Sequence, residues 1–144
     1  MRLRRFRSER GAELIELALV LPILLLVFAS IVDFGLVMQR YLTLNNAARE
    51  GARIAVLPGY SQTDVQNRVT EYVREGTGDF TLSPVAVLTP VSIDPPGATP
   101  AFPAARVSVT MPYSYLIVGP VLQLFNKSLS SITLTAVSTM RIES

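Results

Sequence analysis

The first half of the chain carries a hydrophobic pattern that is typical of one long helix. Residues 17–32 form an uncharged run of sixteen. Apolar residues then return every three or four positions, which places them on one face of a helix. They are Val37, Tyr41, Leu44, Ala48, Ala52 and Ala55. Pro58 and Gly59 then give a strong stop signal. The pattern predicts a helix over about residues 12–57.

The uncharged run predicts that this helix crosses a membrane. A hydrocarbon core of about 30 Å needs about 20 helical residues, whereas sixteen residues reach only about 24 Å. The span must therefore include flanking residues, and we expect it over about residues 14–38. Glu16, Asp33 or both then lie at or inside the membrane boundary, where a carboxylate is costly.

Pro22 lies inside the predicted span. Proline removes the hydrogen bond to the carbonyl of Ala18 and bends the helix, a change that membrane helices tolerate when neighbours satisfy the freed group. Two interpretations stay open at this point. Pro22 is either a harmless kink or a flexible point at which the helix stretches or melts when subunits pack.

Small residues recur at four-residue spacing in the second part of the helix. Ala47, Gly51 and Ala55 form a stripe that lets a neighbouring element approach closely. The neighbour is either the protein's own sheet or a helix of another subunit.

The second half of the chain predicts a small α+β domain. Ser61 to Asp64 resembles a capping box, and valines at helical spacing follow, so we expect a second helix over about residues 62–75 with a solvated charged face. The period then changes to two, which predicts three strands: one broken at Pro90, one ended or placed at an edge by Pro112, and a last one near the C-terminus. Without a long crossover helix, the sheet should be antiparallel.

Three segments follow from these patterns: a basic leader over residues 1–11, the long helix over residues 12–57, and a head over residues 58–144. The predicted fold is a transmembrane helix that continues into this head, with the projecting half of the helix covering the sheet. Residues 115–125 are apolar and irregular. They are either tucked under the sheet or form an exposed patch that marks a contact.

Charge and composition exclude several classes of function. Residues 1–11 contain five arginines and one glutamate, while the remaining residues contain eight basic and ten acidic ones, so the tip carries +4 and the rest −2. This asymmetry favours a cytoplasmic N-terminus over nucleic-acid binding. The absence of Cys and His removes thiol nucleophiles, imidazole bases and the usual zinc ligands. We therefore expect no enzyme activity, metal or cofactor.

The junction between the arginines and the apolar run is unusual. Gly11 and Ala12 follow the arginines, and Glu16 stands five residues after Gly11. A removable secretory signal with a cleavage site near Ala29 or Ser30 is the rival interpretation. The acids at Glu13 and Glu16 argue against it, because an apolar region should begin there.

The residues of this junction resemble the N-terminal signature of the TadE-like family, which comprises minor pilins or pseudopilins of the tight adherence (Flp, type IVc) pilus system. The resemblance is carried by Arg10-Gly11-Ala12-Glu13-Leu14-Ile15-Glu16-Leu17-Ala18-Leu19-Val20-Leu21-Pro22, by Asp33-Phe34-Gly35, by Asn46-Ala47-Ala48-Arg49-Glu50-Gly51-Ala52-Arg53 and by the ending Ser138-Thr139-Met140-Arg141-Ile142-Glu143. Leu17 departs from the aromatic residue of major Flp pilins, which fits a minor component.

The resemblance implies cleavage by a prepilin peptidase between Gly11 and Ala12. It also implies that Glu16 pairs with the free amine of a neighbouring subunit or of its own chain. The implied partners are other pilins, pilus assembly proteins, the peptidase and membrane lipid. We expect a single-pass protein of the inner membrane with its head outside, which assembles by helix packing. The alternatives are a membrane-anchored binding module and a pseudopilin of a type II secretion-like apparatus.

Overall fold

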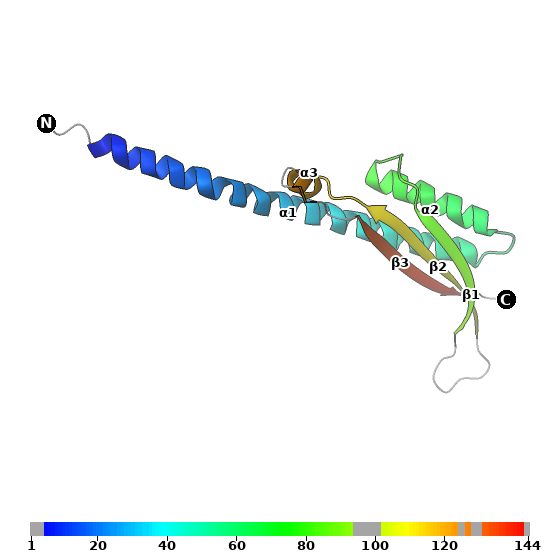
Figure 1. The fold of residues 1–144 in the computed structure, drawn as a ribbon. Helices are drawn as coiled ribbons and strands as arrows, with labels where there is room; N and C mark the ends of the chain where they lie inside the picture. The colour runs from blue at the N-terminus through cyan, green and yellow to red at the C-terminus, as the bar shows by residue number, and fades with distance from the viewer. Residues whose placement is uncertain (1–4, 94–101, 124–125, 128–130, 143–144) are drawn as a thin grey trace. The chain divides into compact units, whose positions relative to one another are not determined.

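A computed structural model describes residues 5–93, 102–123, 126–127 and 131–142 of the chain. The chain divides into two units (Figure 1). The first contains residues up to Gly35 together with the segment that begins at Tyr115, and the second contains residues 36–114 and 130–144. The predicted leader and the apolar segment lie only partly within these ranges, because residues 1–4 and 124–125 fall outside them.

Two helices contribute to the first unit. Helix α1 (Arg5–Ala55) is the predicted long helix, and its residues up to Gly35 belong here. It begins within the arginine-rich leader, seven residues before the expected start. The short helix α3 (Val118–Gln123) was not predicted, because Gly119 and Pro120 indicate a loop. Both stand in its first turn, where proline is tolerated since the first helical N–H groups have no intrahelical partner.

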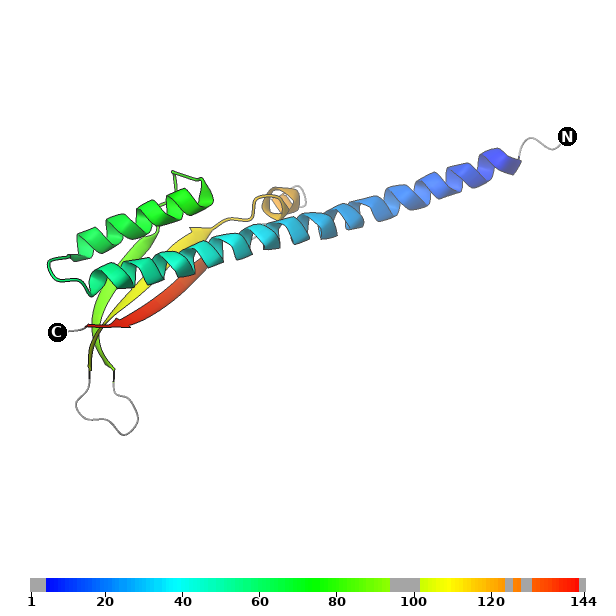
Figure 2. The ribbon, with the colours of Figure 1, turned by 180° about the vertical axis from the view of Figure 1, so that it is seen from behind.

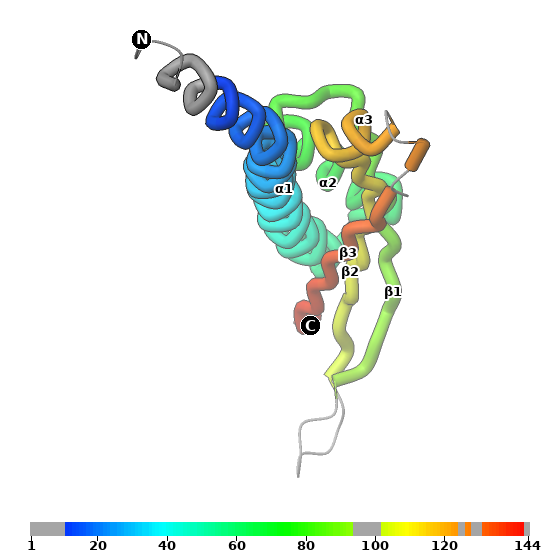
Figure 3. The backbone as a smooth tube through the Cα atoms, turned by 60° about the vertical axis from the view of Figure 1, so that its left-hand side comes forward, coloured from blue at the N-terminus to red at the C-terminus, as the bar shows by residue number. Residues whose placement is uncertain are grey.

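The second unit is the α+β head that the sequence predicted. It combines the end of α1 with α2 (Gln62–Thr77) and the strands β1 (Val85–Ile93), β2 (Phe102–Tyr113) and β3 (Ile132–Arg141). The strands form one antiparallel sheet in the order β1-β2-β3, with β2 in the middle (Figure 3). The sheet lies in front of the end of α1 and α2 in Figure 1 and behind them in Figure 2, so both helices cover the same face. The predicted α+β fold is confirmed.

The core of the head lies between that sheet face and the two helices. Alternate residues of β2 point into it, namely Ala105, Val107, Val109, Met111 and Tyr113. The register places Val109 between Ala86 and Ala136, which are also buried. The helices add Leu44, Ala47, Ala48 and Ala52 from α1 and Val65, Val69 and Val73 from α2. The predicted partnership between the helix and the sheet is therefore confirmed.

Of the two prolines in the predicted strands, Pro90 differs from its prediction and Pro112 fits one of its two alternatives, an edge position. Strand β1 is not broken at Pro90, which pairs with Ala105 in the ladder. An edge strand tolerates proline because the missing N–H can face away from the sheet. Strand β2 continues through Pro112, which pairs with Thr133 of β3. The pairing of β1 with β2 starts only at Val85 and Thr110, so β2 is a local edge at Pro112.

Two glutamines of α2 satisfy the outer edge of β1. Gln62 accepts a hydrogen bond from the N–H of Leu88 at 2.7 Å and donates one to the carbonyl of Ala86 at 2.6 Å. Gln66 accepts from the N–H of Ala86 and donates to the carbonyl of Pro84, both at 2.7 Å. Each side-chain amide offers a donor and an acceptor, as the backbone of a neighbouring strand would. This arrangement seals an edge that would otherwise be open to pairing.

The predicted capping box at the start of α2 is confirmed. Asp64 accepts hydrogen bonds from the N–H of Ser61 at 2.8 Å and from its hydroxyl at 2.7 Å, while the N–H of Asp64 donates to the same hydroxyl. The hydroxyl of Ser61, followed by its N–H, lowers the pKa of Asp64 from the usual 3.8. The other end of α2 closes at Gly78, whose φ of 69° suits glycine.

The capping box makes part of the stability of the head depend on pH. Because the pKa of Asp64 is lower in the folded chain, its contribution is complete above the unfolded value of 3.8 and is lost as the pH falls through the folded value. We expect Asp64→Asn to lower the melting temperature at neutral pH, and the gap to the unaltered chain to close in strong acid. Circular dichroism melts of both chains across this pH range measure the gap. A gap that stays constant down to the lowest pH would contradict the prediction.

Candidate functional site

The N-terminal junction lies on an open part of α1. Gly11 is half-buried and has no atom within 4 Å of the position of an added side chain. Ala12 and Glu16 are exposed. Within the described ranges no hydrogen bond or ion pair reaches Glu16. The structure therefore presents both the predicted cleavage position and the predicted pairing acid on the surface of a single chain.

The helix that follows is apolar and almost fully exposed. The segment from Gly11 to Ala55 contains a window of 18 residues with a mean hydropathy of 2.7, long and apolar enough to cross a membrane, and only 6% of that window is buried. This exposure is unlike that of a core helix in a soluble protein, whose apolar side chains are covered. The helix continues through Pro22. The role of Pro22 as a flexible point stays a prediction.

One face of this helix is nevertheless buried. Among residues 11–35 only Ala29 and Asp33, one turn apart, are buried, with 7% and 2% of their surface exposed. Asp33 accepts hydrogen bonds from three consecutive backbone N–H groups. Leu116 donates to Oδ1 at 3.1 Å, Ile117 donates to both carboxylate oxygens at 3.1 Å, and Val118 donates to Oδ2 at 2.7 Å. Asp33 thus caps α3 from another helix.

The sequence missed this role of Asp33. Its position near the end of the apolar run placed it at the membrane boundary, but nothing in the pattern paired it with residues 83 to 85 positions later in the chain. The available signal was the apolar segment with Gly119 and Pro120, which is compatible with a short helix that needs a cap. A carboxylate that accepts several backbone N–H groups forms strong, charge-assisted hydrogen bonds. The arrangement therefore ties residues 116–118 firmly to α1.

The small-residue stripe of α1 lies inside the head. Ala47 and Gly51 are buried and Ala55 is half-buried. A side chain on Gly51 would approach Cγ2 of Val69 in α2 to 2.8 Å and Cγ1 of Val107 in β2 to 3.3 Å. The absence of a side chain at residue 51 therefore lets α1, α2 and the sheet meet at this point. A contact of the stripe with another subunit stays a prediction.

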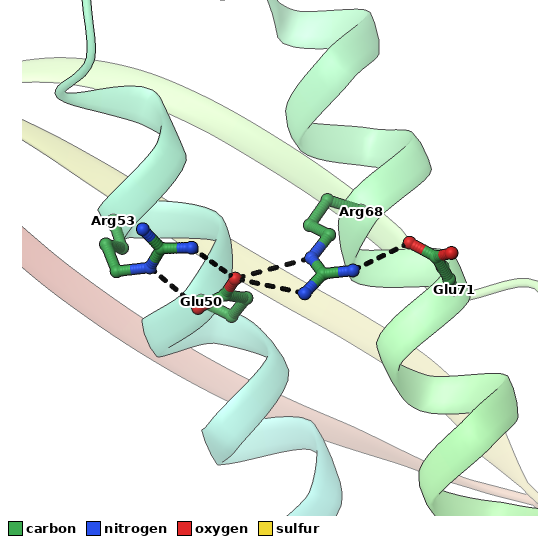
Figure 4. Close-up of polar contacts among 4 residues, drawn as sticks. All are labelled: Glu50, Arg53, Arg68 and Glu71. Atoms are coloured by element: carbon green, nitrogen blue, oxygen red, sulfur yellow. Dashed lines mark hydrogen bonds and ion pairs between the residues drawn. The ribbon is translucent and has the colours of Figure 1, made fainter.

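A charged cluster joins the two helices beside Gly51 (Figure 4). Glu50 of α1 accepts two hydrogen bonds from Arg53, at 2.7 and 2.9 Å, and two from Arg68 of α2, both at 3.3 Å. Arg68 also pairs with Glu71 at 2.8 Å. The predicted solvated face of α2 therefore takes part in contacts between helices. The side chains are partly exposed, so the cluster adds orientation more than stability.

The described residues contain no group of three or more Asp, Glu, His or Cys side chains that could hold a metal ion. The chemically notable carboxylates are instead three separate ones with different surroundings. Glu16 is exposed on an apolar helix, Asp33 is buried against backbone N–H groups, and Glu50 lies between two arginines. None of these arrangements presents a pair of carboxylates for acid–base chemistry.

Comparisons with known proteins agree with the features of α1. No curated protein and no solved structure matches the chain. Residues 11–53 match the family model described as TadE-like protein. The match begins at Gly11 and includes the apolar run, Asp33 and the stripe through Gly51. The resemblance predicted from the sequence is thereby confirmed: residues 11–53 of this chain are similar to the TadE-like proteins.

Proposed function

We propose that this chain is a minor pilin, or a pilin-like assembly protein, of the tight adherence pilus system. The TadE-like match supports association with that system. The observation that carries the proposal is the coincidence of this match with an exposed apolar helix that contains an exposed acid, Glu16, near its start. The proposed role is structural rather than enzymatic, since the helix packs with other pilins.

The proposed topology places α1 across the inner membrane. The arginines of the leader favour a cytoplasmic N-terminus and an external head. The exposure of Leu14, Leu19 and Leu24, each at 60% or more, supports contact with lipid before assembly and with neighbouring helices afterwards. Tight packing of apolar helices in a fibre would cover the same side chains.

Glu16 is the proposed pairing acid. A carboxylate near the centre of a bilayer costs about 3 kcal/mol and less near its boundary. A nearby ammonium group reduces that cost by favouring the charged form. The free amine of a neighbouring processed subunit is such a group. The partners of this chain would then include other pilins, assembly proteins and a prepilin peptidase that creates the amine.

The proposed cleavage follows Gly11. No neighbouring atom lies within 4 Å of the position that a side chain on Gly11 would take, which supports access by a peptidase. Glycine also lowers the stability of a helix interior by about 1 kcal/mol relative to alanine. Local unwinding at Gly11 would therefore be easier than at its neighbours, and a peptidase needs an unwound segment to reach the backbone.

The mass of the mature chain tests this step. We expect Gly11→Leu to block removal of the leader, because a bulky side chain would fill the open space at residue 11, directly before the cleaved bond. Mass spectrometry of the purified protein should then find a chain that starts at Met1, whereas the unaltered chain should start at Ala12.

Gly35→Leu is the matched control, since Gly35 lies on the same helix with equally open surroundings. An unaltered chain that starts at Met1 would favour a tethered binding module. A start near Asp33 would favour a removed secretory signal and a soluble exported head.

A further inference from the structure

The segment held by Asp33 has the composition of a segment that contacts a membrane rather than that of a solvated loop. Residues 114–123 contain no charged side chain. Leu116 is 66% exposed, although three backbone N–H groups around it are fixed on Asp33. A polar tether thus holds an apolar side chain in a position where the protein itself does not cover it.

The neighbouring turns of α1 have the same character. Phe28, Ile31 and Phe34 are about two-thirds exposed, and they flank the buried pair formed by Ala29 and Asp33. All of these residues belong to the same unit as the tethered segment. The hydrogen bonds of Asp33 therefore hold residues 116–118 beside the turns of α1 that carry these exposed apolar side chains.

The depth of Asp33 fits the far boundary of a bilayer. Asp33 stands 17 residues after Glu16, which corresponds to roughly 26 Å along a helix. A hydrocarbon core of about 30 Å then places Asp33 near one boundary when Glu16 lies near the other. A non-helical backbone segment is tolerated at such a depth only when its polar groups are satisfied within the protein. Asp33 satisfies the N–H groups of residues 116–118 in that way.

We propose that residues 115–123 form an interfacial anchor that Asp33 holds in the lipid at the membrane face from which the head extends. Leu116 enters the boundary of the hydrocarbon region, and α3 lies beside the span. The buried carboxylate and the three N–H groups compensate one another, so neither is exposed to lipid without a partner. This inference rests on the proposed membrane span of α1, and its test separates the two.

Depth-dependent quenching in nanodiscs tests the anchor. The chain has no cysteine, so single cysteines introduced at Leu116, Ile31 and Phe80 can each carry one fluorescent label. The full chain is placed in nanodiscs that contain doxyl-labelled phosphatidylcholine and no protein besides the scaffold. Phe80 is the matched reporter on the head, because it is 69% exposed. We expect several-fold stronger quenching at residues 116 and 31 than at residue 80.

The tether is tested by Asp33→Asn, which keeps the shape of the side chain but offers an amide N–H to backbone donors. Quenching at residue 116 should fall to the level of residue 80, while quenching at residue 31 stays unchanged. Asp64→Asn, the same substitution on the head, should leave all three reporters as they were. Circular dichroism melts confirm that the head remains folded in each variant.

Each other quenching result contradicts one part of the proposal: the membrane span, the anchor or the tether. Weak quenching at residue 31 would remove the membrane span and with it the proposed function. Strong quenching at residue 31 with weak quenching at residue 116 would overturn the anchor alone and leave the segment for a neighbouring helix to cover. Strong quenching at residue 116 that survives Asp33→Asn would overturn the role of the tether.

Discussion

Replacing Gly51 by leucine is expected to destabilise the head strongly. The first added atom already meets Cγ2 of Val69 at 2.8 Å and Cγ1 of Val107 at 3.3 Å, and both belong to short branched side chains that cannot swing away. Overpacking of this kind costs about 3 kcal/mol. For a domain of this size that corresponds to a fall in melting temperature of roughly 15 °C. Circular dichroism melts of the full chain in detergent measure the change.

Two further variants separate packing at Gly51 from helix propensity. Gly35→Leu changes the same residue type on the same helix at an open position, so the head should melt as before. Val69→Ala should reduce the cost of Gly51→Ala, because the two side chains compete for one space. An unchanged melting temperature for Gly51→Leu would contradict the described packing of α1 against α2 and β2.

Replacing Glu16 by alanine is expected to stop assembly without disturbing insertion or cleavage. The substitution leaves a neighbouring ammonium group without its counter-charge in an apolar environment, which we expect to lower subunit association at least about tenfold. Crosslinking through a cysteine at exposed Leu19 reports on contacts between subunits. Recovery of the protein in sheared pili reports on the fibre itself.

Glu13 provides the control for the Glu16 variant. It is an exposed acid one turn earlier on α1, and Glu13→Ala should leave crosslinking intact. Glu16→Gln should behave like Glu16→Ala, since it retains the shape and loses the charge. Normal crosslinking and normal fibres with Glu16→Ala would refute pairing as the basis of assembly.

The head could be predicted largely because its patterns are local. The capping box of α2 needs only Ser61 and Asp64, and the alternation in β2 places Val107 and Val109 on one face whatever surrounds the strand. The antiparallel pairing follows from the lack of a long crossover helix in the sequence between the strands. These features depend on residues close together in the sequence.

The features that escaped prediction depend on distant residues. Whether Pro90 ends a strand depends on whether that strand lies at an edge, and only the assembled sheet decides this. Helix α3 depends on Asp33, more than 80 positions earlier. The contact of Glu50 with Arg68 depends on the angle at which two helices meet. A single sequence contains these residue types but not their proximity.

The glutamine amides along β1 have a consequence for crowding. In a fibre or a packed membrane, heads meet at high local concentration. A sheet with two unpaired edge strands could then add copies on both sides without limit. Here Gln62 and Gln66 occupy the backbone hydrogen-bonding groups at the outer edge of β1. Strand addition through the other edge strand, β3, would stop at a dimer. The molecule can therefore be concentrated without nucleating a continuous intermolecular sheet.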